Sequence, residues 1–332
     1  MSKDTNRMAW LEERRSGIGG TDVAAILGLS EWKSPMQVWL EKTGQAELSD
    51  EAPSDPAYWG RMLEPIVAQE YKQRHPEYQV WQAQKAPITR HQEFPVLIAT
   101  PDRIVGPAGN NVFLTGGAIN WPRVDRILEV KTANAFSRED WGTPGTEEVP
   151  QAYLLQCLHY LNVTGLQEID LAVLFGGNQY CEYRIGYDED ICEWLKGQML
   201  NWWNTQVIGK IAPEALSVDD LAARFPYNRG GFKPISEKLG EALRHYVTAS
   251  EATKECETDM RHSKFVLCNA VAEADGLCNE EGKPLVTWKT NCNGTRCFRI
   301  TREALERVGE EIAGDREHYS YPHARVCEEV SA

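Results

Sequence analysis

The sequence lacks a long apolar run, although hydrophobic residues make up 42% of its 332 residues. A helix that crosses a bilayer needs roughly 20 consecutive apolar residues, and no stretch of the chain approaches that length. The N-terminal segment MSKDTNRMAWLEERRSG carries charged side chains where a secretory signal would require an uninterrupted apolar stretch. These absences predict a protein without a membrane span, located in the cytoplasm.

Paired cysteine motifs are also missing. None of the nine cysteines stands in a Cys-x-x-Cys pair, the spacing typical of zinc ribbons and redox sites. In a reducing compartment the ordinary state of such residues is a buried free thiol. A zinc site in the C-terminal third is disfavoured, because the candidate ligands are irregularly spaced. These candidates are His262, His318, His323, Cys256, Cys268, Cys278, Cys292, Cys297 and Cys327.

Positive charge is scarce, since 35 lysines and arginines face 49 aspartates and glutamates, for a formal net charge of −14. Neutralisation of phosphates supplies most non-specific affinity for nucleic acids, so this balance argues against a protein that coats them indiscriminately. Carboxylates that hold divalent cations would themselves add negative charge. Any nucleic-acid track must therefore be a local basic patch.

Hydrophobic periodicity and turn residues divide the chain into alternating helices and strands up to about residue 209. We predict helices at 35–43, 58–74, 150–162 and 188–208. We predict strands at 78–81, 86–90, 96–105, 127–132, 169–175 and 180–185. The Gly- and Asn-rich region 106–123 is predicted to be an extended loop or a small hairpin.

Three parts are expected along the chain. Residues 1–209 form an α/β (α+β) domain with a central mixed sheet flanked by helices. Residues 210–234 contain prolines and a Gly-Gly pair with little periodicity, which predicts a linker. Residues 235–332 form a C-terminal extension, a helical arm followed by a β-hairpin that turns at Asn293-Gly294.

The segments ATPDRIV and ILEVKT carry the chemical signal. Asp102 falls within one predicted strand, and Glu129 and Lys131 lie two apart on another, so alternation places both side chains on one face. Two carboxylates, with the backbone carbonyl of Val130, suit Mg²⁺ or Mn²⁺, which prefer oxygen ligands. An adjacent ammonium group could position a water or stabilise charge at a phosphorus. The pattern predicts metal-dependent phosphodiester hydrolysis.

The alternative interpretation is a pair of surface carboxylates and a lysine on exposed strand faces, because short patterns of this kind arise by chance. The context favours the catalytic interpretation. Glu129 is flanked by Ile127, Leu128 and Val130, and a carboxylate on such a strand is costly to bury without a partner or a metal.

The next predicted helix places Gln156 and Tyr160 one turn apart on the same face. By itself this spacing is equally typical of an amphipathic core helix with a buried tyrosine. Its position directly after the strand that carries Glu129 and Lys131 connects it with the proposed catalytic centre.

Taken in order, these motifs resemble those of the YqaJ-type viral recombinase nucleases, relatives of phage lambda exonuclease within the PD-(D/E)xK superfamily. The resemblance runs from about Trp10 to Trp203. The segments that carry it are RRSGIGGTDVAAILGLSEWKSPMQVWLEKTG, WGRMLEPIVAQEY, ATPDRIV, ILEVKTAN, VPQAYLLQCLHYLNVTG and LAVLFGGNQY. One departure is the loop at 106–123, which is longer than the family pattern leads us to expect.

The resemblance implies a restriction-endonuclease-like core and a role for each site residue. Asp102, Glu129 and the Val130 carbonyl would be metal ligands, and Glu64 would be the helix-borne acidic residue of the same site. Lys131 would be the catalytic lysine. Gln156 and Tyr160 would form the QxxxY motif, which this family shares with RecB-type nucleases.

The resemblance also implies an activity and partners. The expected function is a 5′ to 3′ exonuclease of phage or prophage recombination that acts on linear double-stranded DNA with two ions of Mg²⁺ or Mn²⁺. Its partners would be DNA ends and a single-strand annealing protein of the RecT or Beta type, inside the host cell. A homo-oligomer is expected, and a ring is the form that the resemblance suggests. Two alternatives stay open: an endonuclease of the same fold, or a non-catalytic protein that binds DNA ends.

A phosphate-binding group is expected near the N-terminus. Arg14 or Arg15, followed by Thr21 after a glycine-containing turn, resembles the part of the family that grips a terminal 5′-phosphate. An arginine fork and a hydroxyl near a helix terminus suit an anion. Arg14 is favoured over Arg15. The alternative is a solvated basic helix end.

Tryptophans could provide stacking surfaces for DNA bases. Trp194, Trp202 and Trp203 lie on one predicted amphipathic helix. In that setting they are more often core residues than base-stacking platforms, and we expect them to be core.

Overall fold

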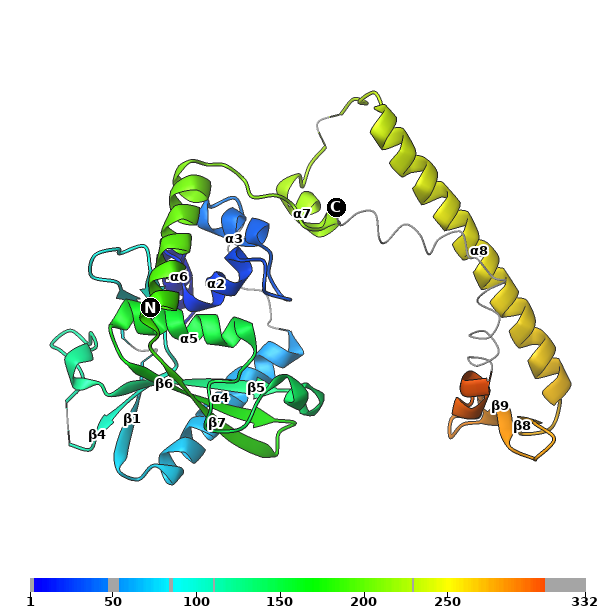
Figure 1. Ribbon diagram of the computed structural model, residues 1–332, viewed down its shortest axis with the longest axis horizontal. Coiled ribbons are helices and arrows are strands. Elements are labelled where there is room, and N and C mark those ends of the chain that lie inside the picture. Colours follow the sequence, from blue (N-terminus) through cyan, green and yellow to red (C-terminus); the bar gives the residue numbers. More distant parts are fainter. Residues whose placement is uncertain (1–2, 47–53, 84–85, 110, 229, 308–332) are drawn as a thin grey trace. The chain divides into compact units, whose positions relative to one another are not determined.

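The computed structural model describes residues 3–46, 54–83, 86–109, 111–228 and 230–307. The chain divides into two compact units, Met1–Arg229 and Gly230–Ala332. Figure 1 shows that the first unit is layered from strands and helices, whereas the second is built on one long helix. Among the described residues, no helix is both long enough and apolar enough to cross a membrane.

A five-stranded mixed sheet forms the centre of the first unit, in the order β1-β4-β5-β6-β7. Its strands are β1 (Tyr78–Gln82), β4 (Arg103–Pro107), β5 (Arg126–Ala133), β6 (Glu168–Phe175) and β7 (Gln179–Gly186). Neighbours are antiparallel except β5 and β6, which run parallel. A parallel pair needs a crossover connection, and helix α5 (Gln151–Thr164) lies within it. The predicted class, a mixed sheet flanked by helices, is confirmed.

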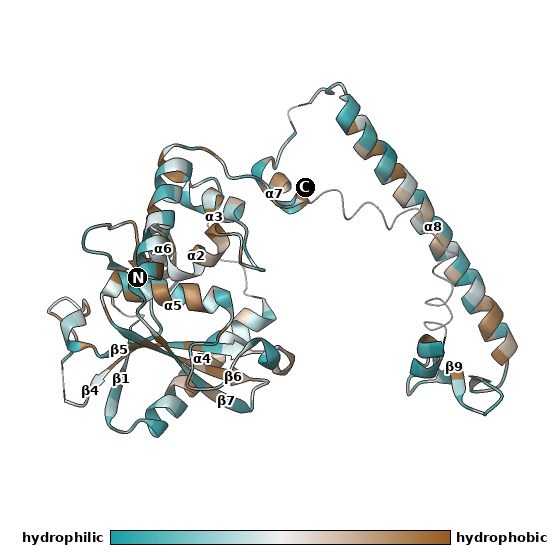
Figure 2. Ribbon diagram, viewed as in Figure 1, coloured by the Kyte–Doolittle hydropathy of each residue, from teal (hydrophilic) through white to brown (hydrophobic). Residues whose placement is uncertain are grey.

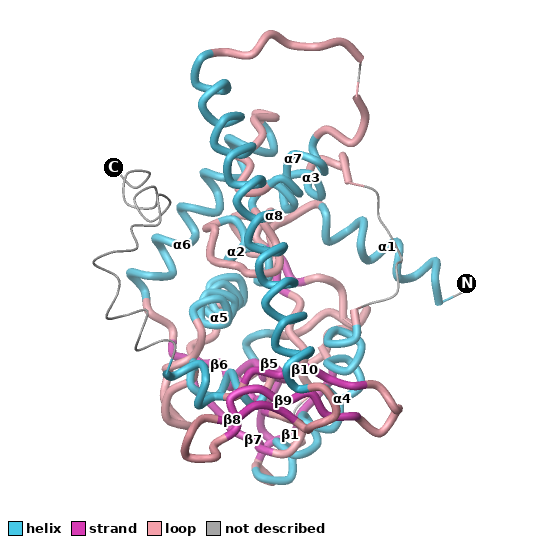
Figure 3. The backbone as a smooth tube through the Cα atoms, turned by 90° about the vertical axis from the view of Figure 1, so that its right-hand side faces the viewer, coloured by secondary structure: helices cyan, strands magenta, loops and turns pink. Residues whose placement is uncertain are grey.

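Different helices cover the two faces of this sheet (Figures 1 and 3). Helix α4 (Asp55–Arg74) packs Tyr71 against the face that carries Val130. Helix α5 covers the opposite face, which carries Ile127. Because side chains alternate along a strand, Glu129 lies on the same face as Ile127, beneath α5. Figure 2 shows that apolar residues are concentrated in these central strands.

The predicted strand 96–105 is interrupted in the structure. Strand β3 (Ile98–Ala99) pairs with β2 (Thr89–Arg90) in a separate two-stranded sheet, and β4 begins only at Arg103. Asp102 therefore lies in the bend between the two strands, and its expected position within a strand was wrong. Pro101 has no N–H group to donate to a neighbouring strand, which accounts for the break at this point.

Three helices precede the sheet: α1 (Lys3–Arg15), α2 (Gly20–Ile26) and α3 (Pro35–Lys42). Helix α3 begins as predicted, with Pro35 at its first position. The side chain of Ser34 accepts a hydrogen bond from the Gln37 N–H, which caps the helix.

The first unit continues beyond residue 209, where the sequence interpretation begins a linker. Helix α7 (Val218–Arg224) lies in this segment and contacts α3. The buried carboxylate of Asp220 accepts hydrogen bonds from the Ser34 hydroxyl and from the Leu216 N–H. Because these contacts tie the segment to the core, the boundary between the compact units falls after Arg229.

The predicted Trp-rich helix consists of α6 (Glu189–Trp202) and a π-helical turn, Trp203–Ile208. Trp202 and Trp203 pack against the hydrophobic core, as predicted. Trp194 is 51% exposed, so its prediction as a core residue was wrong. Its neighbour Leu195 is buried, and each step along a helix turns the side chain by roughly 100°.

Cysteine burial differs between the two units. Cys157, Cys181 and Cys192 of the first unit are buried free thiols, as expected. Cys256, Cys278 and Cys292 of the second unit are exposed, so the general expectation of burial was wrong for them. Cys268 and Cys297 are partly exposed, and three further candidates, Cys327, His318 and His323, lie outside the described residues.

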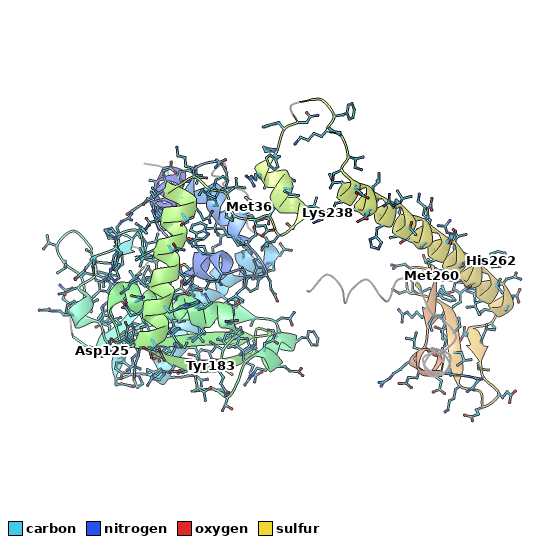
Figure 4. All side chains as sticks on the ribbon, turned by 45° about the horizontal axis from the view of Figure 1, so that its top comes forward. Met36, Asp125, Tyr183, Lys238, Met260 and His262 are labelled. Atoms are coloured by element: carbon cyan, nitrogen blue, oxygen red, sulfur yellow. The ribbon has the colours of Figure 1, made fainter. Side chains whose placement is uncertain are left out.

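The second unit consists of the long helix α8 (Glu237–Val271) and a three-stranded antiparallel sheet. The strands are β8 (Gly276–Cys278), β9 (Pro284–Thr290) and β10 (Arg296–Ile300). The guanidinium of Arg296 donates to the carbonyls of Ala272 and Ala274 and so fastens the sheet to the end of α8. Along the rest of the helix, side chains such as Met260 and His262 project outward (Figure 4).

Candidate active site

The candidate site is centred on β5, where Glu129 and Lys131 project from one face, as the alternation predicts. Lys131 Nζ lies 2.6 Å from Glu129 Oε1. Burial opposes the charged form of the lysine, but the negative charges of Glu129 and Asp102 outweigh it and raise the pKa of Lys131. Lys131 is therefore an ammonium group throughout the physiological pH range.

Helix α5 holds Glu129 from above the sheet. Gln156 Nε2 donates to Glu129 Oε1 at 2.6 Å and lies 3.3 Å from the Tyr160 hydroxyl oxygen. The Tyr160 hydroxyl donates to the Thr100 carbonyl at 3.3 Å, and burial raises the pKa of Tyr160. The structure thus brings Gln156 and Tyr160 to the same carboxylate as Lys131.

Asp102 reaches this cluster from the bend that precedes β4. Strand β4 pairs with β5 only as far as Arg103 and Leu128, so the next N–H groups of β5 have no strand partner on that side. Asp102 Oδ2 accepts the Val130 N–H at 3.0 Å. Burial and the negative charge of Glu129 raise the pKa of Asp102 to about 7. The Asp102 side chain therefore accepts a β5 N–H group that has no strand partner, and it lies near the carboxylate of Glu129.

The donor atoms of this cluster fit a divalent cation. Glu129 Oε2 is buried and, among the described residues, has no hydrogen-bond partner. A buried anionic oxygen without a partner is costly, and a cation shared with Asp102 would relieve both charges. Within the described ranges, no three His, Cys, Asp or Glu side chains form a ready-made cation site. The fitting set is therefore two carboxylates supplemented by the Val130 carbonyl.

Glu64, the expected helix-borne acidic residue, is engaged by a buried arginine. Arg103 Nη1 lies 2.6 Å from Glu64 Oε1 and also donates to the Asp102 carbonyl at 2.8 Å. Glu64 is close enough for its charge to raise the pKa of Asp102 further, although it contributes less than burial or Glu129. The sequence reasoning missed Arg103, which stands directly after Asp102 and reads as an ordinary strand residue.

The two adjacent arginines before α2 have different hydrogen-bond partners. Arg14 Nη2 donates to the Thr21 hydroxyl, as the preferred interpretation requires. Arg15 turns away from Thr21, and its guanidinium donates to Glu12 and to the Ala46 carbonyl. The structure therefore joins Arg14 with Thr21 and separates Arg15 from them.

A buried ion pair fixes the helix that carries Thr21. Asp22 Oδ2 lies 2.7 Å from Lys42 Nζ and accepts the Gly19 N–H at 3.0 Å, while Asp22 Oδ1 lies 3.2 Å from Lys33 Nζ. Burial opposes the charged carboxylate, but Lys42, Lys33 and Arg14 outweigh it and lower the pKa of Asp22. Sequence reasoning missed this cluster, because Asp22 and Lys42 lie on separate helices and Lys33 lies in the loop between them.

Gly20 allows the N-terminal helices to approach α5. A Cβ atom at this position would lie 2.7 Å from Tyr160 Cε1 and 2.8 Å from Gln156 Cγ, closer than side chains tolerate. The missing side chain therefore brings the Arg14–Thr21 pair next to the cluster around Glu129. In the sequence, the glycine-containing turn before Thr21 was the one signal for this close approach to α5.

His159 ties the same segments together from α5. Its Nε2 lies 3.1 Å from the Ile18 carbonyl and 3.0 Å from the Ile98 carbonyl, which fixes the hydrogen on Nε2. Burial lowers the pKa of His159 to about 4. The residue is thus a neutral structural donor to the segment before α2 and to strand β3, and not a catalytic base.

Residues 9–167 match the model of the YqaJ-like viral recombinase domain. This segment contains the whole cluster around Glu129 and also the Arg14–Thr21 pair. The match confirms the resemblance to this family that the sequence motifs predicted.

Similar proteins extend the comparison. The chain is 36% identical over 214 residues to the uncharacterized protein YqaJ of Bacillus subtilis (strain 168). That alignment covers 64% of this chain and 60% of the relative, so it spans less than two thirds of the relative's length.

Two solved structures are similar at lower identity. An alkaline exonuclease (LHK-Exo) from Laribacter hongkongensis is 17% identical, with a TM-score of 0.47 over 61% of this chain and 93% of that one. A phage-related exonuclease from Haemophilus somnus 129PT is 9% identical, with a TM-score of 0.41 over 58% of this chain and 96% of that one.

Proposed function

We propose that this protein is a divalent-metal-dependent deoxyribonuclease that degrades linear double-stranded DNA in the 5′ to 3′ direction. One observation carries the proposal: Glu129 has a buried oxygen without a hydrogen-bond partner among the described residues, beside Asp102 and Lys131. A structural carboxylate would have both oxygens satisfied. The YqaJ-like viral recombinase domain supports the choice of DNA as substrate.

Each residue of the cluster has a role in this reaction. Asp102, Glu129 and the Val130 carbonyl would hold Mg²⁺ or Mn²⁺, and Glu64 would contribute to a second ion. A bound cation would neutralise charge at the phosphate and make a water molecule easier to deprotonate. Lys131 orients the attacking water or stabilises the charge that develops on the phosphate. Gln156, itself near Tyr160, keeps Glu129 in place.

The Arg14–Thr21 pair would hold the terminal 5′-phosphate. Lys33 and Lys42 are ion-paired with Asp22, Lys33 is also ion-paired with Glu41, and the charge of Arg14 acts on Asp22, so three cations stand against two carboxylates here. A guanidinium and a hydroxyl are suitable donors to a phosphate. The overall charge of −14 makes such a local patch necessary.

The wider biological role is proposed from the family resemblance. We propose that the enzyme exposes single strands during phage or prophage recombination for a RecT- or Beta-type annealing protein in the host cytoplasm. A homo-oligomer that surrounds DNA would account for continuous digestion from one end. Co-purification with an annealing protein and light scattering of the full chain would test these two points.

The activity is tested by incubating the full chain with linear and closed circular duplex DNA in Mg²⁺, and then in EDTA. We expect degradation of the linear DNA alone, and only with the metal. Equal cleavage of closed circles would establish the endonuclease alternative. Binding to ends without hydrolysis would establish the non-catalytic alternative.

The role of Arg14 is tested with ends that differ only in the 5′-phosphate. Loss of one charge-assisted contact costs about 1.5–3 kcal/mol, so Arg14→Ala should slow digestion of phosphorylated ends roughly tenfold to a hundredfold. Digestion of 5′-hydroxyl ends should change far less. Arg15→Ala is the matched control, because Arg15 faces Glu12 and Ala46. Equal slowing of both ends by Arg14→Ala would contradict the phosphate assignment.

A further inference from the structure

One large aromatic side chain beside the candidate site is not explained by core packing. Trp32 lies in the loop between α2 and α3 and is 71% exposed. Leaving most of an indole ring in water forgoes the free energy that burial would provide. A single exposed aromatic residue is ordinary on a protein surface, so its meaning depends on what holds it and what lies beside it.

The ring of Trp32 is nevertheless held in place. It stacks on Tyr153 of α5, with 6.4 Å between ring centroids and 24° between ring planes. The backbone N–H of Trp32 donates to the Ser30 hydroxyl at 3.2 Å, and the next residue, Lys33, is ion-paired with Asp22 and Glu41. The exposed face of the indole is therefore presented by a supported loop.

This aromatic pair lies between the two functional clusters. On one side, Lys131 Nζ lies 5.4 Å from the centroid of the Tyr153 ring. On the other, Trp32 and Thr21 line the same surface cavity, of about 520 Å³, together with Lys33 and Gln37. Trp32 thus adjoins both the hydroxyl assigned to the 5′-phosphate and the aromatic neighbour of the catalytic lysine.

We propose that Trp32, supported by Tyr153, stacks on the nucleobase of the 5′-terminal nucleotide. The inference rests on the proposed function, because it places the phosphate of that nucleotide at Thr21. Every base has an aromatic face, so stacking would hold the end without selecting a sequence. The predicted site is thus a sequence-independent base platform beside the phosphate site.

The test measures binding of the full chain to short 5′-phosphorylated duplexes in EDTA, so that hydrolysis does not interfere. One duplex has a normal 5′-terminal nucleotide, and the other has an abasic residue there. Trp32→Ala should weaken binding to the normal end roughly fivefold to a hundredfold. Trp32→Phe should retain most of the affinity. Trp194→Ala is the matched control, because Trp194 is 51% exposed on α6 and has no described contact with the site.

The abasic duplex separates a loss of base stacking from a general weakening of DNA binding. The wild-type chain should lose a similar factor on the abasic duplex, and Trp32→Ala should lose nothing further. Equal weakening of both duplexes by Trp32→Ala, or no weakening at all, would overturn the proposal. A chain that shows the stacking pattern but hydrolyses no DNA in Mg²⁺ would support the platform and contradict the proposed nuclease. A wild-type chain that binds neither end would contradict both.

Discussion

Glu129 and Asp170 are buried carboxylates on the neighbouring strands β5 and β6, but their surroundings differ. Asp170 accepts hydrogen bonds from Tyr71, Arg126 and Arg184, which engage both of its oxygens. Glu129 receives Lys131 and Gln156 on one oxygen, and Oε2 has no hydrogen-bond partner within the described part of the chain. Both side chains are only 4% exposed.

The two carboxylates lie on opposite faces of the same sheet, and the difference indicates opposite roles. A buried charge with a complete set of partners contributes to folding, because removing it leaves those partners unpaired. A buried charge with an unused oxygen is a position where a cation can bind. Burial is the same for both carboxylates, so only the number of engaged oxygens distinguishes Glu129, the proposed metal ligand, from Asp170.

The largest expected effect is on hydrolysis. Glu129→Gln and Lys131→Ala should each reduce cleavage of linear duplex DNA at least about a thousandfold, because each removes charge from the reacting centre. Thermal unfolding should show that both variants remain folded. Near-normal turnover of either variant at saturating Mg²⁺ would contradict the assignment of this cluster as the active site.

The opposite result is expected for Asp170. Asp170→Asn should lower the free energy of unfolding by about 3 kcal/mol or more, because Arg126 and Arg184 lose their buried partner. Hydrolysis per folded molecule should be unchanged. Glu168→Gln is the matched control, since Glu168 contacts the same arginines from a side chain that is 45% exposed. A loss of activity in folded Asp170→Asn would remove the distinction between the two carboxylates.

The buried histidine His159 should make the stability of the first unit depend on pH. Because the folded state lowers the pKa of His159 from 6.5 to about 4, protons bind preferentially to the unfolded chain. The contribution of His159 to stability should be complete above pH 6.5 and disappear as the pH falls through 4, a change of up to about 3 kcal/mol. We expect the free energy of unfolding in urea to fall between pH 6.5 and 4 in the wild type, and to fall much less in His159→Gln. An equal dependence on pH in both chains would show that another group is responsible.

The smallest effect concerns Asp220, a buried carboxylate with a hydrogen-bond partner on each oxygen. It lies beyond residue 209, where the sequence predicted the end of the first domain. A chain that ends at Arg229 should unfold like the first unit of the full chain and keep Mg²⁺-dependent cleavage of short duplexes. A chain that ends at Ile211 should also cleave them, but be about 1–2 kcal/mol less stable, because Ser34 loses its bond to Asp220. Equal stability of both truncated chains would show that α7 contributes nothing to the first unit.

Several features of the site followed from the sequence because they depend on regular backbone geometry. A period of two places Glu129 and Lys131 on one face of β5, and a spacing of four places Gln156 and Tyr160 on one face of α5. The Ser34-Pro35 pair marks the start of α3 for an equally local reason, the capping of free N–H groups. These features need no knowledge of what the segments pack against.

Other features were decided only by the tertiary structure. Asp102 lies in a bend and reaches the site by accepting the Val130 N–H, which depends on where the pairing of β4 with β5 ends. Arg14 rather than Arg15 meets Thr21 because Arg15 is held by partners elsewhere. The sequence determined which side chains share a face, because that is set by the backbone period. Which faces meet depends on the packing of segments far apart in the chain, and no local pattern records it.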